Sequence, residues 1–233
     1  MKYRFIFTGI FPIFLAACTM ATPTPAITQA PTIVVSNTPA PVVTFTPTPV
    51  RVSLTVKSAL VNCRFGPGIT YELINELDSG ESARVVGRNE DSTWLFVRDP
   101  GNPNGYCWVS ADVVETQGAV DQLPVQPNPF VTVTDVSLRA EPSRIVVNCD
   151  QFPQTIFLEA EVTSNGPTFV TWRWEASTGV SSTDTILAFE KAGMQVINDY
   201  YQIGSPNDYW VKLHILGPNE VIEEVKIPVN CTQ

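Results

Sequence analysis

Short apolar runs bounded by turn-forming residues constrain the fold of this chain more than any other feature. Between Arg51 and Glu115 the runs read SLTVKSALVN, YELINEL, ARVVGR, TWLFV and CWVSADVV, and the segments between them include GPG, DSGE, NEDS and DPGNPNG. Runs of this length, separated by Gly, Pro, Asn and Asp, are typical of β-strands joined by turns. The five runs predict a small all-β barrel.

A second set of apolar runs follows between Pro129 and Gln233. Ile156 to Val162 alternates apolar with polar residues, and the turn Asn165-Gly166-Pro167 leads into the run VTWRW. Alternation of this kind places successive side chains on opposite faces of a strand. About seven short strands predict a two-sheet sandwich that resembles an immunoglobulin-like domain, with Trp174 in its core. The expected fold class is therefore all-β: a small barrel plus an Ig-like β-sandwich.

The N-terminus has the features of an export signal. Lys2 and Arg4 give it a positive start, and Phe5 to Phe14 form an apolar stretch too short to span a bilayer. The stretch ends in Leu-Ala-Ala-Cys18, which resembles the bacterial lipobox, where the cysteine is lipidated and the signal is cleaved before it. The resemblance implies a signal peptide over residues 1–17 and a lipid-anchored protein on the extracytoplasmic face of the cell membrane or envelope. The alternative is an ordinary secreted protein in which Cys18 stays unmodified.

The segment after Cys18 differs in composition from the rest of the chain. From Thr19 to Val50 there is no charged residue, and nine threonines and seven prolines alternate with small apolar residues. Such a segment cannot pack a hydrophobic core, and its prolines favour an extended, polyproline-like backbone. Residues 18–50 are therefore expected to form a disordered Thr/Pro-rich linker that lifts the folded part away from the lipid.

The cysteine count fits an exported, lipidated protein. Five cysteines would leave one free thiol in an oxidising compartment unless one is acylated. Without Cys18, four remain: Cys63, Cys107, Cys149 and Cys231. Three connectivities are possible, and the simplest joins the first with the second and the third with the fourth, one disulfide in each predicted domain. A zinc site is the alternative, but the sequence has no Cys-x-x-Cys and only one histidine.

An ordered set of residues in the first region matches the pattern of a known family. The set comprises Asn62 to Gly68 (NCRFGPG), Tyr71, Leu73-Ile74, Leu77, Gly80-Glu81, Val85 to Arg88, Trp94 and Trp108-Val109. In order and spacing it resembles a bacterial SH3-like (SH3b) domain, and the likeness covers about 65 of the 233 residues. Cys63 and Cys107 depart from the pattern, since the family usually has an aliphatic residue and a glycine there.

The resemblance also implies a ligand, because SH3b domains usually bind cell-wall peptides or glycans. Carried over to this sequence, it implies one candidate surface: Arg64, Phe65, Tyr71, Trp94 and Trp108. The alternative is that the tyrosine and both tryptophans are core residues, since each lies in an apolar run.

Charge and motifs disfavour other classes of function. The chain has a formal net charge of −9, which argues against binding nucleic acid or anionic lipid surfaces. No G-x-S-x-G, H-E-x-x-H or Walker motif occurs, and any histidine-dependent hydrolysis would have to use His214. No catalytic residue, cofactor or metal is therefore expected, and the protein is not expected to be an enzyme.

These expectations divide the chain into five segments. They are a lipoprotein signal peptide (1–17), the lipidated cysteine and linker (18–50), an SH3-like domain (51–116), a short linker (117–129) and an Ig-like sandwich (130–233). The expected function is that of a membrane-anchored, non-enzymatic cell-envelope lipoprotein that binds peptidoglycan or other envelope ligands. The alternative is a structural stalk or protein–protein interaction lipoprotein that does not bind the wall.

Overall fold

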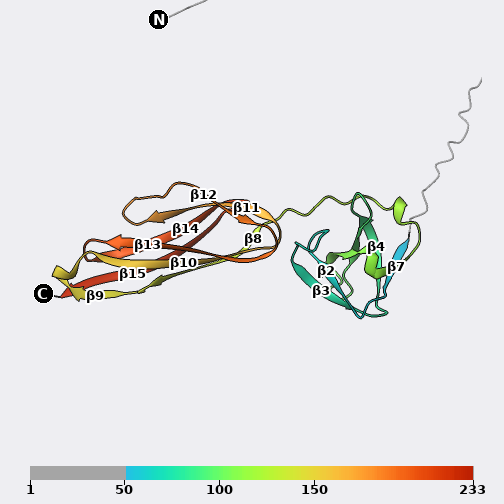
Figure 1. Ribbon diagram of the computed structural model, residues 1–233, viewed down its shortest axis with the longest axis horizontal. Coiled ribbons are helices and arrows are strands. Elements are labelled where there is room, and N and C mark those ends of the chain that lie inside the picture. The colour runs from blue at the N-terminus through green and yellow to red at the C-terminus, as the bar shows by residue number, and fades with distance from the viewer. Residues whose placement is uncertain (1–50, 233) are drawn as a thin grey trace, which may run out of the picture. The chain divides into compact units, whose positions relative to one another are not determined.

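The computed structural model describes residues 51–232 of the 233-residue chain. The expected signal peptide, lipidated Cys18 and Thr/Pro-rich linker lie outside the described residues. Within them the protein is all-β, as expected, with 15 strands and three 3-10 turns (Figure 1). No helix in residues 51–232 is long and apolar enough to cross a membrane.

The first seven strands form one sheet, which we call the N-terminal sheet. Its strands are β1 (Val52–Val56), β2 (Leu60–Arg64), β3 (Leu73–Asp78), β4 (Ser82–Arg88), β5 (Trp94–Arg98), β6 (Tyr106–Ser110) and β7 (Val114–Gln117), hydrogen-bonded in the order β3-β2-β6-β5-β4-β1-β7. Every strand contributes buried residues to a single core, among them Leu54, Leu77 and Leu95. Because one core is shared by all seven strands, the sheet must curve around it.

Two of the predicted runs each contain two strands, which explains why seven strands form where five were expected. The run SLTVKSALVN divides into β1 and β2 at the polar residues Lys57 and Ser58, and CWVSADVV divides into β6 and β7 at the 3-10 turn η1 (Ala111–Val113). These divisions let β1 pair with β4 on one side and β7 on the other.

The segment expected to be a linker, 117–129, packs in part on the N-terminal sheet. A second 3-10 turn, η2 (Val120–Gln122), is followed by Leu123, which is buried in the core of the sheet. Arg88 N donates to Pro124 O, and Gln126 N donates to Arg88 O. The chain is therefore held to the sheet as far as Gln126.

The remaining strands form two sheets that share a second core, which we call the sandwich. They are β8 (Val133–Glu141), β9 (Ile145–Asn148), β10 (Gln154–Ser164), β11 (Thr168–Ala176), β12 (Thr185–Phe189), β13 (Gly193–Ile203), β14 (Asn207–Gly217) and β15 (Val221–Thr232). The three-stranded sheet has the order β13-β10-β8, and the five-stranded sheet β12-β11-β14-β15-β9 (Figure 1).

The core of the sandwich follows the alternation seen in the sequence. Ile156, Leu158, Ala160 and Val162 are buried on the inner side of β10, as their spacing predicts. Trp174 of β11 belongs to the same core and is 8% exposed. Eight strands form where about seven were expected, because the short strand β9 pairs in parallel with the end of β15.

Both disulfides have the pairing expected from the sequence. Cys63 of β2 bonds to Cys107 of β6, and Cys149 of the third 3-10 turn, η3 (Cys149–Gln151), bonds to Cys231 of β15. The second disulfide joins segments at the margin of the sandwich. Two disulfides in one chain indicate an extracellular or otherwise oxidising environment.

Candidate ligand-binding surface

The outward face of β5 and β6 carries most of the aromatic side chains of the N-terminal sheet. In the antiparallel pair, Trp94 lies opposite Ser110, Phe96 opposite Trp108, and Arg98 opposite Tyr106. The residues between them on β5, Leu95 and Val97, are buried in the core. Alternation along each strand therefore places Trp94, Phe96, Arg98 and Tyr106 on one face, which we call the aromatic strip.

Three members of the aromatic strip, Phe96, Arg98 and Tyr106, contact one another. The rings of Phe96 and Tyr106 are stacked, with centroids 5.3 Å apart and an interplanar angle of 21°. The guanidinium carbon of Arg98 lies 5.8 Å from the Tyr106 ring centroid, and Arg98 Nη2 donates to Tyr106 Oη at 3.4 Å. Stacking and cation–π contacts hold these side chains in fixed positions. The strip is thus an ordered surface, with Tyr106 43% exposed.

Trp108 lies beneath the strip and does not form part of its surface. Its ring centroid is 5.1 Å from that of Phe96, and the residue is only 2% exposed. A ring buried to this degree offers no face to a ligand. The expectation that Trp108 is a stacking platform is therefore not met, and the alternative, a packing role, describes its position. Trp94 is partly exposed, and its role as a platform stays a prediction.

The loop from Arg64 to Tyr71 is closed by its own contacts. Arg64 Nη1 donates to Tyr71 O at 2.9 Å, and Phe65 N donates to Glu72 O at 2.9 Å. The Tyr71 ring occupies the space that a Cβ on Gly66 would need, so this glycine is required for the close approach. Arg64, Phe65 and Tyr71 are all partly buried. The arginine side chain is committed to holding the loop.

The structure groups the predicted site residues in two places. Trp94 and Trp108 lie on β5 and β6, and Arg64 lies opposite Trp108 at the end of β2, whereas Phe65 and Tyr71 belong to the adjoining loop. The sequence prediction missed three residues of the strip: Phe96, Arg98 and Tyr106. Their two-residue spacing in TWLFVR and YCWVS was a usable signal, but only the register of β5 on β6 shows that the two sets meet.

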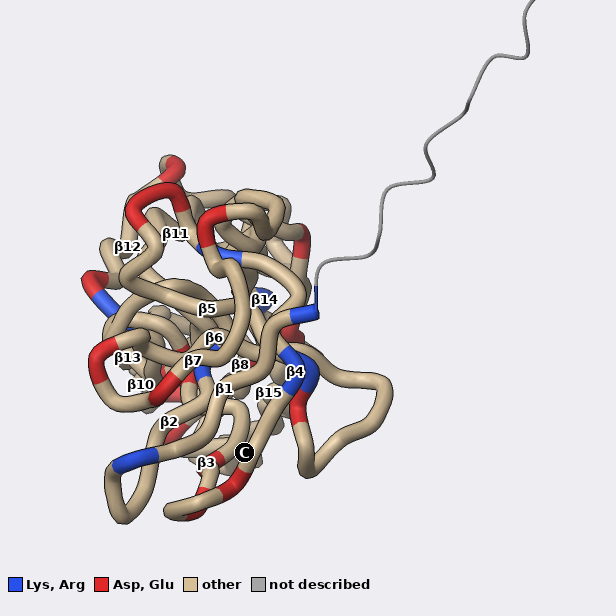
Figure 2. The backbone as a smooth tube through the Cα atoms, turned by 90° about the vertical axis from the view of Figure 1, so that its right-hand side faces the viewer, with Lys and Arg blue, Asp and Glu red and all other residues tan. Residues whose placement is uncertain are grey.

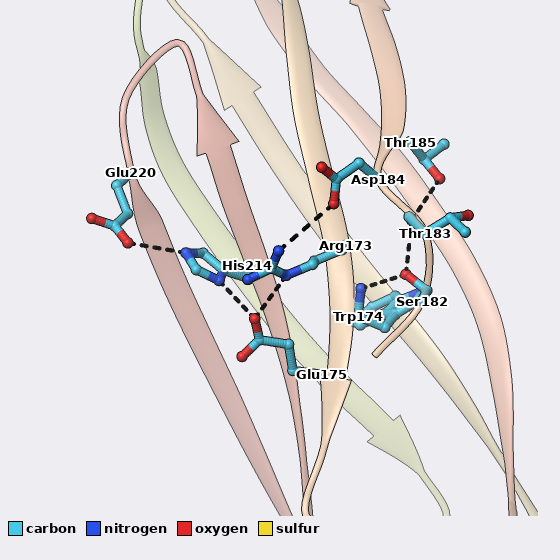
Figure 3. Close-up of polar contacts among 9 residues, drawn as sticks. All are labelled: Arg173, Trp174, Glu175, Ser182, Thr183, Asp184, Thr185, His214 and Glu220. Atoms are coloured by element: carbon cyan, nitrogen blue, oxygen red, sulfur yellow. Dashed lines mark hydrogen bonds and ion pairs between the residues drawn. The ribbon is translucent and has the colours of Figure 1, made fainter. Parts of the chain in front are cut away.

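A second polar cluster lies on the outer face of the five-stranded sheet and surrounds the only histidine (Figure 3). His214 Nδ1 lies 2.9 Å from Glu175 Oε1, and His214 Nε2 lies 3.0 Å from Glu220 Oε1. Arg173 Nε donates to the same Glu175 oxygen at 2.8 Å, and its Nη1 lies 3.8 Å from Asp184. Both ring nitrogens of the histidine therefore face carboxylates.

These contacts shift the protonation of both partners. The hydrogen bond to Glu175 is the main cause that raises the pKa of His214 above 6.5, and the bond to Glu220 adds to it. The same hydrogen bond, followed by that from Arg173, lowers the pKa of Glu175 below 4.5. In this geometry a protonated His214 can donate one hydrogen bond to each of the two carboxylates. The nearby Ser182 hydroxyl instead accepts from Trp174 N and donates to Thr183 O.

Charged groups are distributed over both parts of the described chain. Figure 2 shows acidic residues on many strands and loops, with fewer basic residues among them. Several of the charges are paired across strands, as in Lys212 with Glu224 at 3.3 Å. The aromatic strip contributes one cation, Arg98, and so combines apolar rings with a single positive charge.

Comparison with known proteins finds a likeness in structure and none in sequence. No protein-family description matches the chain, and no curated protein is similar to it in sequence. Among solved structures, the chain is similar to the CARDB domain of the PF1109 protein from Pyrococcus furiosus, determined in complex with di-metal ions. That likeness has 14% sequence identity and a TM-score of 0.35, and it covers 45% of this chain and 96% of the other. It adds nothing to the all-β architecture described above.

Proposed function

We propose that this protein is a non-enzymatic cell-envelope lipoprotein whose N-terminal sheet is an SH3-like barrel that binds peptidoglycan or a related wall ligand. The observation that carries the proposal is the aromatic strip, an ordered row of partly exposed rings with one arginine at its end. Its position on a rigid pair of strands fixes the spacing of the rings before any ligand arrives, which lowers the entropic cost of binding.

The chemistry of the aromatic strip suits wall material. Phe96 and Tyr106 present flat apolar faces, on which the C–H faces of a sugar ring can pack, and the tyrosine hydroxyl adds a polar edge. Arg98 carries a guanidinium that can donate paired hydrogen bonds to a carboxylate, such as that of a stem peptide. Glycan stacking and carboxylate binding would then occur side by side.

The proposed location follows from the N-terminal sequence and agrees with the disulfides. A lipid on Cys18 would hold the chain at the outer side of the membrane, where both disulfides are stable. An uncharged, proline-rich spacer would then place the aromatic strip within reach of the wall. The alternative proposal, a stalk that contacts only other proteins, uses the same anchor without the ligand.

A pulldown with insoluble cell wall separates the two proposals. The lipid-free chain from Thr19 to Gln233 is mixed with purified peptidoglycan, and the bound fraction is compared with that of an unrelated acidic protein. We expect Tyr106→Ala to weaken binding about two- to tenfold, which corresponds to the loss of one aromatic contact. Phe169→Ala in the sandwich, at a side chain 72% exposed, is the control and should bind as the unmodified chain does.

A third variant tests the loop against the strip. Phe65→Ala removes the partly buried aromatic of the predicted loop without altering Phe96 or Tyr106. Wall binding that is lost in Phe65→Ala and kept in Tyr106→Ala would move the site to the loop. No enrichment of the unmodified chain over the unrelated acidic protein would exclude wall binding and favour the stalk.

A further inference from the structure

Strand β13 is an edge strand along its full length. All 11 of its residues pair with β10, from Gly193 opposite Ser164 to Ile203 opposite Gln154. In the sheet order β13-β10-β8 it has no second neighbour among the described strands. The side chain of Gln195 donates to Ala188 O of β12, and the Tyr201 hydroxyl bonds to Thr178 Oγ1 in the turn after β11. These contacts hold the strand in place without using its backbone edge.

The outer face of β13 carries three large apolar side chains. Met194, Val196 and Tyr200 are 53%, 43% and 62% exposed. Phe157 of β10 lies directly opposite Tyr200 and is 64% exposed, so the two rings widen the apolar surface. An uncovered edge next to an apolar face is the usual template for pairing with another strand.

The opposite edge of the same sheet is protected by charge, whereas β13 is not. On the outer face of β8, Asp135, Arg139 and Glu141 alternate with Ser137, and Arg139 forms an ion pair with Glu159. Native sheets use such charged residues to block edge pairing. Strand β13 (GMQVINDYYQI) contains one charged residue, Asp199, and neither lysine nor proline.

The backbone donors of β13 indicate which residues face the free edge. Tyr200 N donates to the Asp199 carboxylate at 2.8 Å, so we take this N–H to point away from β10. In an antiparallel ladder every second residue points the same way. Met194, Asn198 and Gln202 have the parity of Tyr200, and they present their N–H and C=O groups at the edge together with Val196.

We propose that β13 of one copy pairs antiparallel with β13 of a second copy, about a two-fold axis at Asn198. In this register Val196 lies opposite Tyr200 on both sides of the axis, and the two asparagines face each other. The one charged residue, Asp199, faces Ile197 and not its own counterpart. The strand can therefore pair with itself without setting like charges opposite each other, as a two-fold interface requires, and two three-stranded sheets become one of six strands.

Disulfide trapping tests the register directly. Hydrogen-bonded partners across an antiparallel ladder have Cα atoms about 5.5 Å apart, within the range that a disulfide spans. We expect Asn198→Cys in the lipid-free chain to form a covalent dimer under mild oxidation. The control is Ser137→Cys, on the outer face of β8 at the other edge of the same sheet. This variant should stay monomeric at the same concentration. Equal dimer yields from the two variants would overturn the proposal.

Sedimentation equilibrium tests the interface without a new thiol. The lipid-free chain is measured from about 10 μM to about 1 mM, a range that covers weak edge pairing. Asn198→Lys sets two like charges against each other at the axis, and we expect at least about tenfold weaker dimerisation. Ser137→Lys adds the same charge to the protected edge and should leave the dimer unchanged. A chain that stays monomeric throughout, or a dimer that tolerates Asn198→Lys, contradicts β13 pairing.

Discussion

His214 makes the stability of the five-stranded sheet depend on pH. Its side chain is 12% exposed and lies between Glu175 and Glu220. Arg173 lies directly opposite His214 on β11 and contacts the same Glu175 oxygen. A protonated imidazole donates to both carboxylates, whereas a neutral ring donates through only one nitrogen and turns a lone pair toward the other carboxylate. The charged form therefore fits the site better.

We expect His214 to stabilise the fold more at pH 5.5 than at pH 8.5. Its pKa is raised in the folded protein, so its contribution is complete below the ordinary value of 6.5 and is lost as the pH rises through the raised value. The pKa of Glu175 is lowered, so its contribution is kept above 4.5 and is lost as the pH falls through the lowered value. The contact between His214 and Glu175 therefore stabilises the fold most between pH 4.5 and pH 6.5.

Thermal unfolding of His214→Gln measures this effect. The drop in Tm relative to the unmodified chain should be larger at pH 5.5 than at pH 8.5. Lys212→Gln on the same strand is the control, because it removes an ion pair with Glu224 that does not involve the histidine, and the drop in Tm should be similar at both pH values. An equal drop for His214→Gln at both pH values would contradict the proposed protonation.

At the scale of the elements, strand positions were predictable wherever one face of the strand is buried and the other is exposed to solvent. The alternation from Ile156 to Val162 identified β10 and its inner face in advance. The alternation fails at Cys107, Trp108 and Val109 of β6, which are all buried although their side chains alternate. Trp108 is buried on the outer face because Phe96 covers it, and a single sequence does not reveal which strand lies alongside.

The aromatic strip was missed for the same reason. Phe96 and Tyr106 are ten positions apart in the sequence, and they meet only through the register of β5 on β6. Strand β9 was not predicted because it is short and pairs in parallel with the distant end of β15. Local patterns identify strands and their faces, whereas long-range pairing decides which side chains form a surface.

The disulfide between β2 and β6 should matter for the stability of the N-terminal sheet. The two strands share only one paired position, Arg64 with Trp108, although Cys63 and Cys107 are both fully buried. Replacing both cysteines with alanine should lower the free energy of unfolding by about 2–5 kcal/mol, because the 44-residue separation is no longer closed in the unfolded chain. Denaturant unfolding of the lipid-free chain provides the measurement.

Replacement of the other disulfide is the matched comparison. Cys149→Ala with Cys231→Ala opens the margin of the sandwich, where both half-cystines are less buried. Trp94 and Trp108 report on the N-terminal sheet and Trp174 on the sandwich, so single-tryptophan variants can assign each transition. A change below about 1 kcal/mol for the first pair would show that the strand pairing is sufficient without the bond.

At the scale of the whole molecule, the disulfides bear on the compartment and the net charge bears on membrane contact. The two disulfides need an oxidising compartment, and the formal net charge of −9 gives a surface that repels anionic lipid and nucleic acid. An acidic protein of this kind has no electrostatic reason to stay at a membrane. If it is retained there, a covalent anchor is the simplest cause, and Cys18 is the fifth cysteine, outside both disulfides.

Replacing this cysteine tests that anchor. We expect the unmodified protein to sediment with membranes and to incorporate a labelled fatty acid, and Cys18→Ala to be released into the soluble fraction or to remain uncleaved, because the lipid can no longer be attached. Thr19→Ala leaves the thiol in place and serves as the control. A processed Cys18→Ala protein that still floats with membranes would show that something other than this lipid holds the chain there.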